Sequence, residues 1–148
     1  MRLLALDVGD ARIGVALSDE TGTLASGLVT LKAVGPRKDA QAVASLVREH
    51  GAGEVVVGLP LRLDGSAGPQ AEKVLAFVER LRRVLRVPVV TRDERLTSVA
   101  AGERLAAAGV KRKDRKARLD QVAAALVLQE HLDERRAVET PAGGGGAA

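Results

Sequence analysis

The 148-residue chain contains no cysteine, tryptophan or tyrosine, and it has two histidines, His50 and His131. The absence of cysteine excludes disulfides, cysteine-ligated zinc, iron–sulfur clusters and thiol nucleophiles. The absence of tyrosine excludes a tyrosyl nucleophile, and two histidines are too few for a multi-histidine metal site. A Ser-His-Asp triad would have to use one of them. The side chains left for chemistry are carboxylates, hydroxyls, lysine and arginine.

Long apolar runs are also absent. No stretch reaches the roughly 20 residues that a membrane helix needs, and an aspartate interrupts the short apolar run near the N-terminus, which is not typical of a signal peptide. We therefore expect a cytoplasmic protein with one folded domain over residues 1–136. The remaining residues, 137–148, contain four consecutive glycines and are expected to form a disordered Gly/Ala-rich tail.

Positive charge is concentrated in two short segments. The net charge is +4, yet residues 111–118 carry +5 and residues 80–86 carry +4, which leaves −5 for the rest of the chain. This distribution favours a polyanionic partner, although solvated helix faces and a basic loop would also explain it. Phe77 is the one aromatic residue and its helical spacing places it in the core, so no platform is available for stacking bases. Any nucleic acid should be recognised by its backbone and shape.

The hydrophobic pattern predicts an α/β fold. Three apolar runs joined by short turns predict an antiparallel meander, and two further strands then alternate with helices. The rules for crossover connections favour a five-stranded mixed sheet in the order 3-2-1-4-5, flanked by helices. The expected strands are 3–8, 13–17, 24–31, 54–58 and 87–91, and the expected helices are 36–51, 69–85, 97–108 and 116–136, with a basic loop before the last helix.

Three positions carry acids that such a fold could bring together. Asp7 ends the central strand, where a carboxylate is costly unless it is paired, ligates a metal or closes a turn. Asp93 and Glu94 follow the fifth strand, and the residues alone do not decide which of them points inward. Asp120 shares one stripe of the last helix with alanines and a valine, although it could instead serve as an acid near the helix N-terminus.

Carboxylates without histidine or cysteine are hard oxygen ligands that suit Mg²⁺ or Mn²⁺. Two such ions about 3.5–4 Å apart can activate water and stabilise the leaving oxygen in phosphodiester cleavage. Sites of α/β sheets form at the carboxyl ends of the strands, which is where these acids are expected. The Gly-rich loop 58–70 before a helix favours anions, but it lacks the Gly-Lys-Ser/Thr of a P-loop.

Four motifs in order resemble the YqgF/RuvX family over residues 3–132. They are the Asp7-Val8-Gly9 motif with residues 12–16, the loop motif at 58–60, 64–66 and 68–72, the segment 93–98, and the segment 120–124. The resemblance implies a ribonuclease H-like fold, similar to the RuvC resolvases. It also implies a metal-dependent nuclease that either resolves Holliday junctions or trims the 5′ end of precursor 16S rRNA.

The resemblance implies roles for individual residues. It places Asp7, Glu94 and Asp120 on the catalytic acids and ligands of Mg²⁺ or Mn²⁺, and so selects Glu94 over Asp93. Asp10 departs from the family, which commonly has an uncharged polar residue there. A junction-cutting enzyme would need a two-fold homodimer. The candidate contacts to nucleic acid are Arg12, Arg62, Ser66, Arg95, Lys111, Arg112, Lys113, Arg115, Lys116 and Arg118.

Two other functions compete with the nuclease. A non-catalytic nucleic-acid-binding or ribosome-assembly factor could keep the fold without the activity. A phosphotransferase of the actin and sugar-kinase type shares similar opening strands, but that fold needs two such domains and this chain has one. The residues do not distinguish branched DNA from precursor rRNA as the substrate, because recognition of the phosphate backbone would serve for both.

Overall fold

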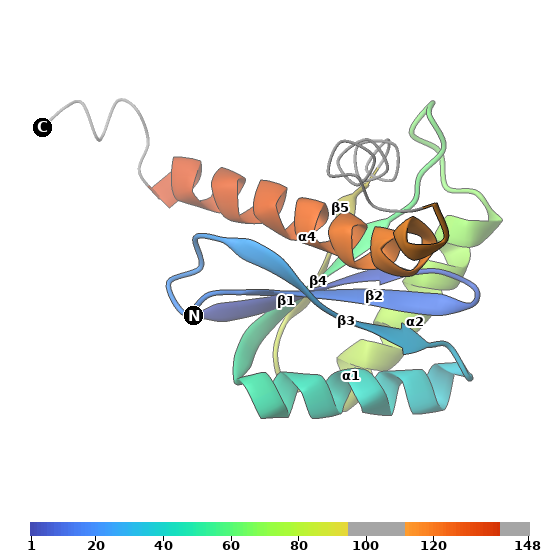
Figure 1. Ribbon diagram of the computed structural model, residues 1–148, viewed down its shortest axis with the longest axis horizontal. Helices are drawn as coiled ribbons and strands as arrows, with labels where there is room; N and C mark the ends of the chain where they lie inside the picture. The colour runs from blue at the N-terminus through green and yellow to red at the C-terminus, as the bar shows by residue number, and fades with distance from the viewer. Residues whose placement is uncertain (95–111, 140–148) are drawn as a thin grey trace, which may run out of the picture.

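The computed structural model describes residues 1–94 and 112–139 of the chain. These ranges contain a five-stranded sheet and three helices (Figure 1). The strands are β1 (Arg2–Val8), β2 (Arg12–Ser18), β3 (Ala25–Lys32), β4 (Ala52–Leu59) and β5 (Val89–Asp93), and the helices are α1 (Pro36–His50), α2 (Pro69–Val84) and α4 (Arg112–Glu139).

The sheet has the strand order β3-β2-β1-β4-β5, which confirms the predicted order. β1 and β3 both pair with β2 in antiparallel fashion, and β4 pairs in parallel with both β1 and β5. β1 is therefore the central strand, and its carboxyl end lies at the same edge as the carboxyl ends of β4 and β5. This edge is where sites form in α/β sheets.

Each face of the sheet packs against its own helices. Figure 1 shows α4 on one face and α1 with α2 on the other. Side chains alternate between the faces along a strand, and in β1 Leu4 and Leu6 contact the core under α1 and α2. Leu3 and Ala5 pack with α4 on the opposite face. Asp7 continues this second set, so its carboxylate is on the α4 face.

The second half of α4 is attached to the sheet by polar contacts. Glu54 on β4 is buried, and its carboxylate accepts hydrogen bonds from Arg135 Nη2 at 2.8 and 2.9 Å. His131 Nε2 lies 3.1 Å from the same carboxylate. Arg92 on β5 pairs with Glu134 at 2.5 Å. These contacts tie the second half of α4 to β4 and β5, and the buried Leu128 and Leu132 pack beneath it.

The predicted boundaries of β5 and α4 are among those that differ from the structure. β5 begins at Val89 rather than at residue 87, because proline lacks an N–H for the ladder and the Pro88 carbonyl instead accepts a hydrogen bond from Val55 N at 2.9 Å. α4 begins at Arg112, so most of the predicted basic loop is helical, as its lysines and arginines allow. The helix also continues to Glu139, three residues into the predicted tail. The predicted helix 97–108 and residues 140–148 lie outside the described ranges.

Phe77 is buried in the core beneath α2, as predicted. None of the helices within the described ranges is both long and apolar enough to cross a membrane.

Candidate functional site

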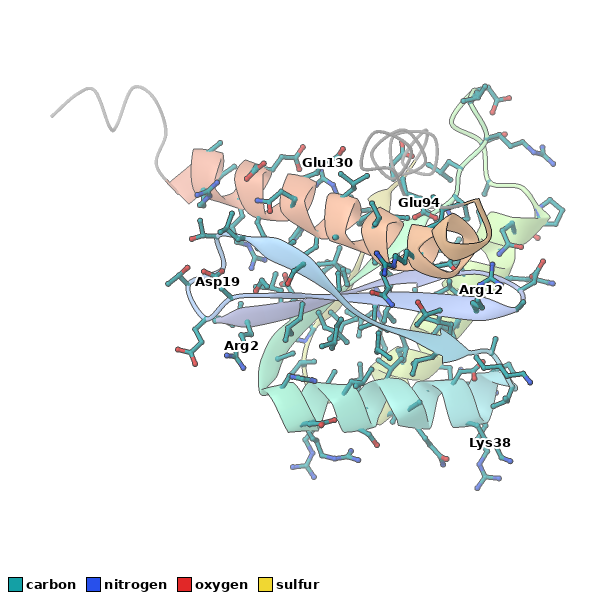
Figure 2. The ribbon with its side chains drawn as sticks, viewed as in Figure 1. Arg2, Arg12, Asp19, Lys38, Glu94 and Glu130 are labelled. Carbon is teal, nitrogen blue, oxygen red and sulfur yellow. The ribbon has the colours of Figure 1, made fainter. Side chains whose placement is uncertain are left out.

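Asp7 and Glu94 form a hydrogen-bonded carboxyl pair at the carboxyl ends of β1 and β5. Glu94 directly follows β5, and its backbone N–H donates to the Leu59 carbonyl at 3.1 Å, which fixes the chain as it leaves the strand. Asp93, the last residue of β5, is more exposed than Glu94. Of the two neighbouring acids, Glu94 is therefore the one that contacts Asp7. Figure 2 shows Glu94 near the beginning of α4.

Removal from water disfavours the ionised forms of this carboxyl pair. Desolvation is the main cause that raises the pKa of Asp7 to about 6, and the charge of Asp120 adds to it while the hydrogen bond from Glu94 opposes it. Desolvation also raises the pKa of Glu94, to about 9, with further contributions from the negative charge of Asp7 and from the hydrogen bond to it. The pair therefore holds one proton between its oxygens at neutral pH, because two adjacent, partly buried carboxylates repel each other.

Two glycines on neighbouring strands make room for the other acids around Asp7. Gly14 on β2 is directly opposite Asp7 in the register, and a Cβ built on it would lie 2.6 Å from the Asp120 Cβ and closer still to the Asp120 backbone. A Cβ on Gly58 of β4 would lie 2.8 Å from Glu94 Cδ. Sequence reasoning missed this role, although glycine within a strand is the known signal for such a close approach.

Asp120 enters the site from α4. Its carboxylate accepts a hydrogen bond from Arg12 Nε at 2.9 Å, and the side chain is largely buried. Its charge acts on Asp7, which places it within electrostatic range of the pair. Even so, no three acidic or histidine side chains in the described part of the chain are grouped as a metal ion would need.

The chemistry of the donors nevertheless fits a divalent cation. Asp7 and Glu94 present partly buried carboxyl oxygens that a positive charge would allow to ionise together, and oxygen donors are those that Mg²⁺ and Mn²⁺ prefer. Asp120 would complete the set if its carboxylate left Arg12.

The candidate contacts to nucleic acid have different surroundings. Arg62 and Ser66 lie in the β4–α2 loop, where Arg62 N donates to the Ser66 carbonyl at 2.9 Å and Ser66 Oγ donates to Asp64 at 2.6 Å. Both side chains are exposed, as is Arg118 on α4. Arg12 instead contacts Asp120. Four further candidates belong to the first turns of α4, and their side chains lie outside the described part: Arg112, Lys113, Arg115 and Lys116. Arg95 and Lys111 also lie outside it.

Most of the basic segment 80–86 lies on α2, which ends at Val84, across the sheet from the acids. Arg82 is engaged within the fold, since its Nη2 donates to the Val89 carbonyl at 2.9 Å and its Nη1 to Glu79 at 2.7 Å. This face does carry a cavity of about 550 Å³, lined by Val8, Ile13 and Phe77 among others. Asp10 lies at the cavity and pairs with Lys73 of α2 at 3.2 Å, so this extra acid is directed to the α2 side.

The raised pKa values predict that the metal-free protein loses stability as pH rises. Because the folded pKa values of Asp7 and Glu94 exceed their ordinary ones, folding favours the protonated forms. That stability is complete below about pH 4 and is lost as pH rises toward about 9. Urea unfolding in EDTA at pH 5, 7 and 9 measures it, and Glu94→Gln should flatten the dependence.

The matched control for this measurement is Glu20→Gln, which changes an exposed glutamate near the other end of β1. It should keep the wild-type pH dependence. An unchanged slope in Glu94→Gln would contradict the assignment of the effect to the carboxyl pair.

Comparison with known proteins assigns this chain to a family. The model of the family described as "RuvX: Holliday junction resolvase" matches residues 1–134. A relative from Thermoanaerobacter pseudethanolicus is 43% identical over 92% of this chain and 99% of its own length. One from Caldanaerobacter subterraneus subsp. tengcongensis is 47% identical, with the same coverage. One from Chloroflexus aurantiacus is 49% identical over 90% of this chain and 88% of its own. Each is named as a pre-16S rRNA nuclease.

Solved structures share the fold at low sequence identity. T. thermophilus RuvC in complex with a Holliday junction substrate superposes with a TM-score of 0.57 at 18% identity, over 92% of this chain and 96% of that one. The fowlpox virus Holliday junction resolvase has a TM-score of 0.55 at 16% identity, over 90% of this chain and 99% of that one. These similarities confirm the predicted ribonuclease H-like, resolvase-type fold.

Proposed function

The chain belongs to the RuvX family, and we propose that it is a nuclease that hydrolyses phosphodiester bonds in structured nucleic acid, with Asp7, Glu94 and Asp120 as its catalytic acids. The family and its named relatives support the reaction class. The observation that carries the assignment to this site is the partly buried Asp7–Glu94 pair on the α4 face, with Asp120 in range.

The acids would hold Mg²⁺ or Mn²⁺. Such a cation, when bound, supplies positive charge that activates water and stabilises the leaving 3′ oxygen. The position of Asp7 is fixed because β1, the central strand, is paired with β2 on one side and β4 on the other. When a cation is bound, Glu94 would lose the proton that it shares with Asp7. Asp120 would contribute its negative charge from α4. All three groups act by binding and orientation, so small displacements should have large effects.

The surroundings of the acids suit a phosphate backbone. Arg62 and Arg118 are exposed on the β4–α2 loop and on α4, and arginine can contact a phosphate with two parallel hydrogen bonds. The single aromatic side chain is buried, so base stacking contributes nothing from the described residues. Branched DNA and precursor rRNA are both compatible with such recognition. The relatives are named for the second substrate and the family for the first.

A cleavage assay on both substrates tests the proposal. The intact chain is incubated with a labelled four-way DNA junction and, separately, with a labelled precursor 16S rRNA leader, in Mg²⁺, Mn²⁺ or EDTA. We expect cleavage in Mg²⁺ or Mn²⁺ and none in EDTA, because uncompensated carboxylates repel the phosphate. The substrate that is cut faster identifies the biological role. Symmetric cutting of the junction would further require a dimer, which sedimentation measures.

Binding of either substrate without cleavage in any metal would contradict the proposal. It would favour the non-catalytic nucleic-acid-binding or ribosome-assembly factor instead.

A further inference from the structure

We propose that Arg12 is a built-in competitor of the cation: it holds the Asp120 carboxylate apart from Asp7 and Glu94 and releases it when a divalent ion binds. Arg12 is thus a positioning residue for the metal site rather than only a contact to nucleic acid. The inference rests on the proposed nuclease function, since it concerns the same three acids.

The backbone geometry places the Asp120 side chain between two possible partners, Arg12 and the acid pair. The Asp120 backbone lies so close to Gly14 on β2 that there is no room for a Cβ atom on Gly14. Asp7 is the residue opposite Gly14 on β1. Arg12 precedes Gly14 by two residues on β2, and it therefore shares the α4 face of the sheet with it. A carboxylate above Gly14 is consequently close to the acid pair on one side and to Arg12 on the other.

The Asp120 carboxylate is bound to Arg12, at 2.9 Å from Nε. This contact agrees with the finding that no three acids of the described residues are grouped for a metal. The Arg12 backbone is held by the hairpin, because its carbonyl accepts a hydrogen bond from Gly9 N at 2.8 Å and the residue pairs with Lys32 of β3. The guanidinium group therefore stays beside Asp120 unless its side chain rotates.

Charge balance explains why the two cations exclude each other. The Asp120 side chain is 19% exposed, and one buried carboxylate cannot satisfy both a guanidinium and a divalent ion without bringing two positive charges together. The Arg12 side chain is 38% exposed, so after release it can turn to solvent or to a phosphate of the substrate. Metal binding and phosphate binding would then support each other through this one side chain.

Two other cations of the described residues have different partners. Arg92 pairs with Glu134 and Glu130 on α4, and Lys73 pairs with Asp10 on the opposite face. Among the ion pairs of the described residues, the Arg12–Asp120 pair is the one that engages an acid of the site. The competition can therefore be tested by changing Arg12 alone.

Calorimetric titration of the intact chain with Mn²⁺ tests the proposal without using activity. We expect Arg12→Gln to bind Mn²⁺ about tenfold more tightly than the wild type, since the competing charge is gone. Arg2→Gln removes an arginine from an exposed ion pair with Glu20 at the far end of β1, and it should leave the affinity unchanged. In an Asp120→Asn background, Arg12→Gln should no longer tighten binding.

Equal or weaker Mn²⁺ binding by folded Arg12→Gln overturns the inference. If that variant does not fold, Arg12→Met replaces it, since it keeps the unbranched apolar stem but removes the charge. A gain of affinity in Arg12→Met that disappears in the Asp120→Asn background supports the inference, and no gain overturns it. Failure of the nuclease proposal looks different: the wild type would then bind no Mn²⁺, or bind it as well after Asp7→Asn.

Discussion

Asp7→Asn is expected to lower the rate of metal-dependent cleavage by about 10³-fold while the protein stays folded. The amide has nearly the shape of the carboxyl and can still hydrogen-bond to Glu94, so the core beneath it is preserved. It removes, however, one of the buried negative charges that a cation requires. Single-turnover cleavage of the preferred substrate in saturating metal measures the effect, and thermal unfolding in EDTA confirms the fold.

The matched control is Asp10→Asn, which removes an acid three positions further along the chain. Asp10 is largely exposed and pairs with Lys73 of α2. Cleavage should stay within about twofold of the wild type, because surface ion pairs are worth little. If Asp10→Asn lost as much activity as Asp7→Asn, the extra acid would belong to the site, and if Asp7→Asn remained active, the acid-centred site would be wrong.

Gly14→Ala is expected to destabilise the protein by about 3 kcal/mol and to lower its melting temperature by about 10 °C. The new Cβ would lie 2.6 Å from the Asp120 Cβ and even closer to the Asp120 carbonyl. The Asp120 carbonyl is part of the α4 backbone and the Asp120 Cβ is bonded directly to it. Neither atom can rotate away as the end of a side chain can. α4 must therefore move off β2, and Asp120 moves with it, so cleavage should fall even well below the melting temperature.

Gly53→Ala provides the control for this substitution. Its Cβ would lie at the same 2.6 Å from Met1 Cγ, but that is the flexible side chain of the first residue. We expect a loss below about 1 kcal/mol, since Met1 can change rotamer. Equal losses from the two alanines, measured by urea unfolding, would mean that α4 is not held against β2 as tightly as the geometry indicates.

The local pattern was sufficient to predict the sheet and the positions of the acids. Unbroken apolar runs and the rule for crossover connections determine the strand order, and they place Asp7 and the acids after β5 at one edge. The apolar stripe of the last helix correctly indicated that Asp120 is on the side of α4 that faces the sheet. These features depend on periodicity, which the sequence displays directly.

Contacts between distant residues were beyond such reasoning. Whether Asp93 or Glu94 points inward depends on the hydrogen bond from Glu94 N to Leu59, which follows from the pairing of β4 with β5. Arg12 was interpreted as a contact to nucleic acid, but its partner Asp120 is 108 positions away. The roles of Gly14 and Gly58 likewise depend on what packs above them.

The attachment of α4 also has a consequence for the order of synthesis. The chain emerges from the ribosome with Asp7 first, yet Asp120 comes near it only when α4 docks on the sheet. The polar anchors of that docking, His131 and Arg135 on Glu54, are translated later still. A nascent chain that has made only its first 94 residues thus holds two of the three acids. The third arrives with α4, the last element of the described fold, so the set of three acids is complete only after α4 has been translated and has docked on the sheet.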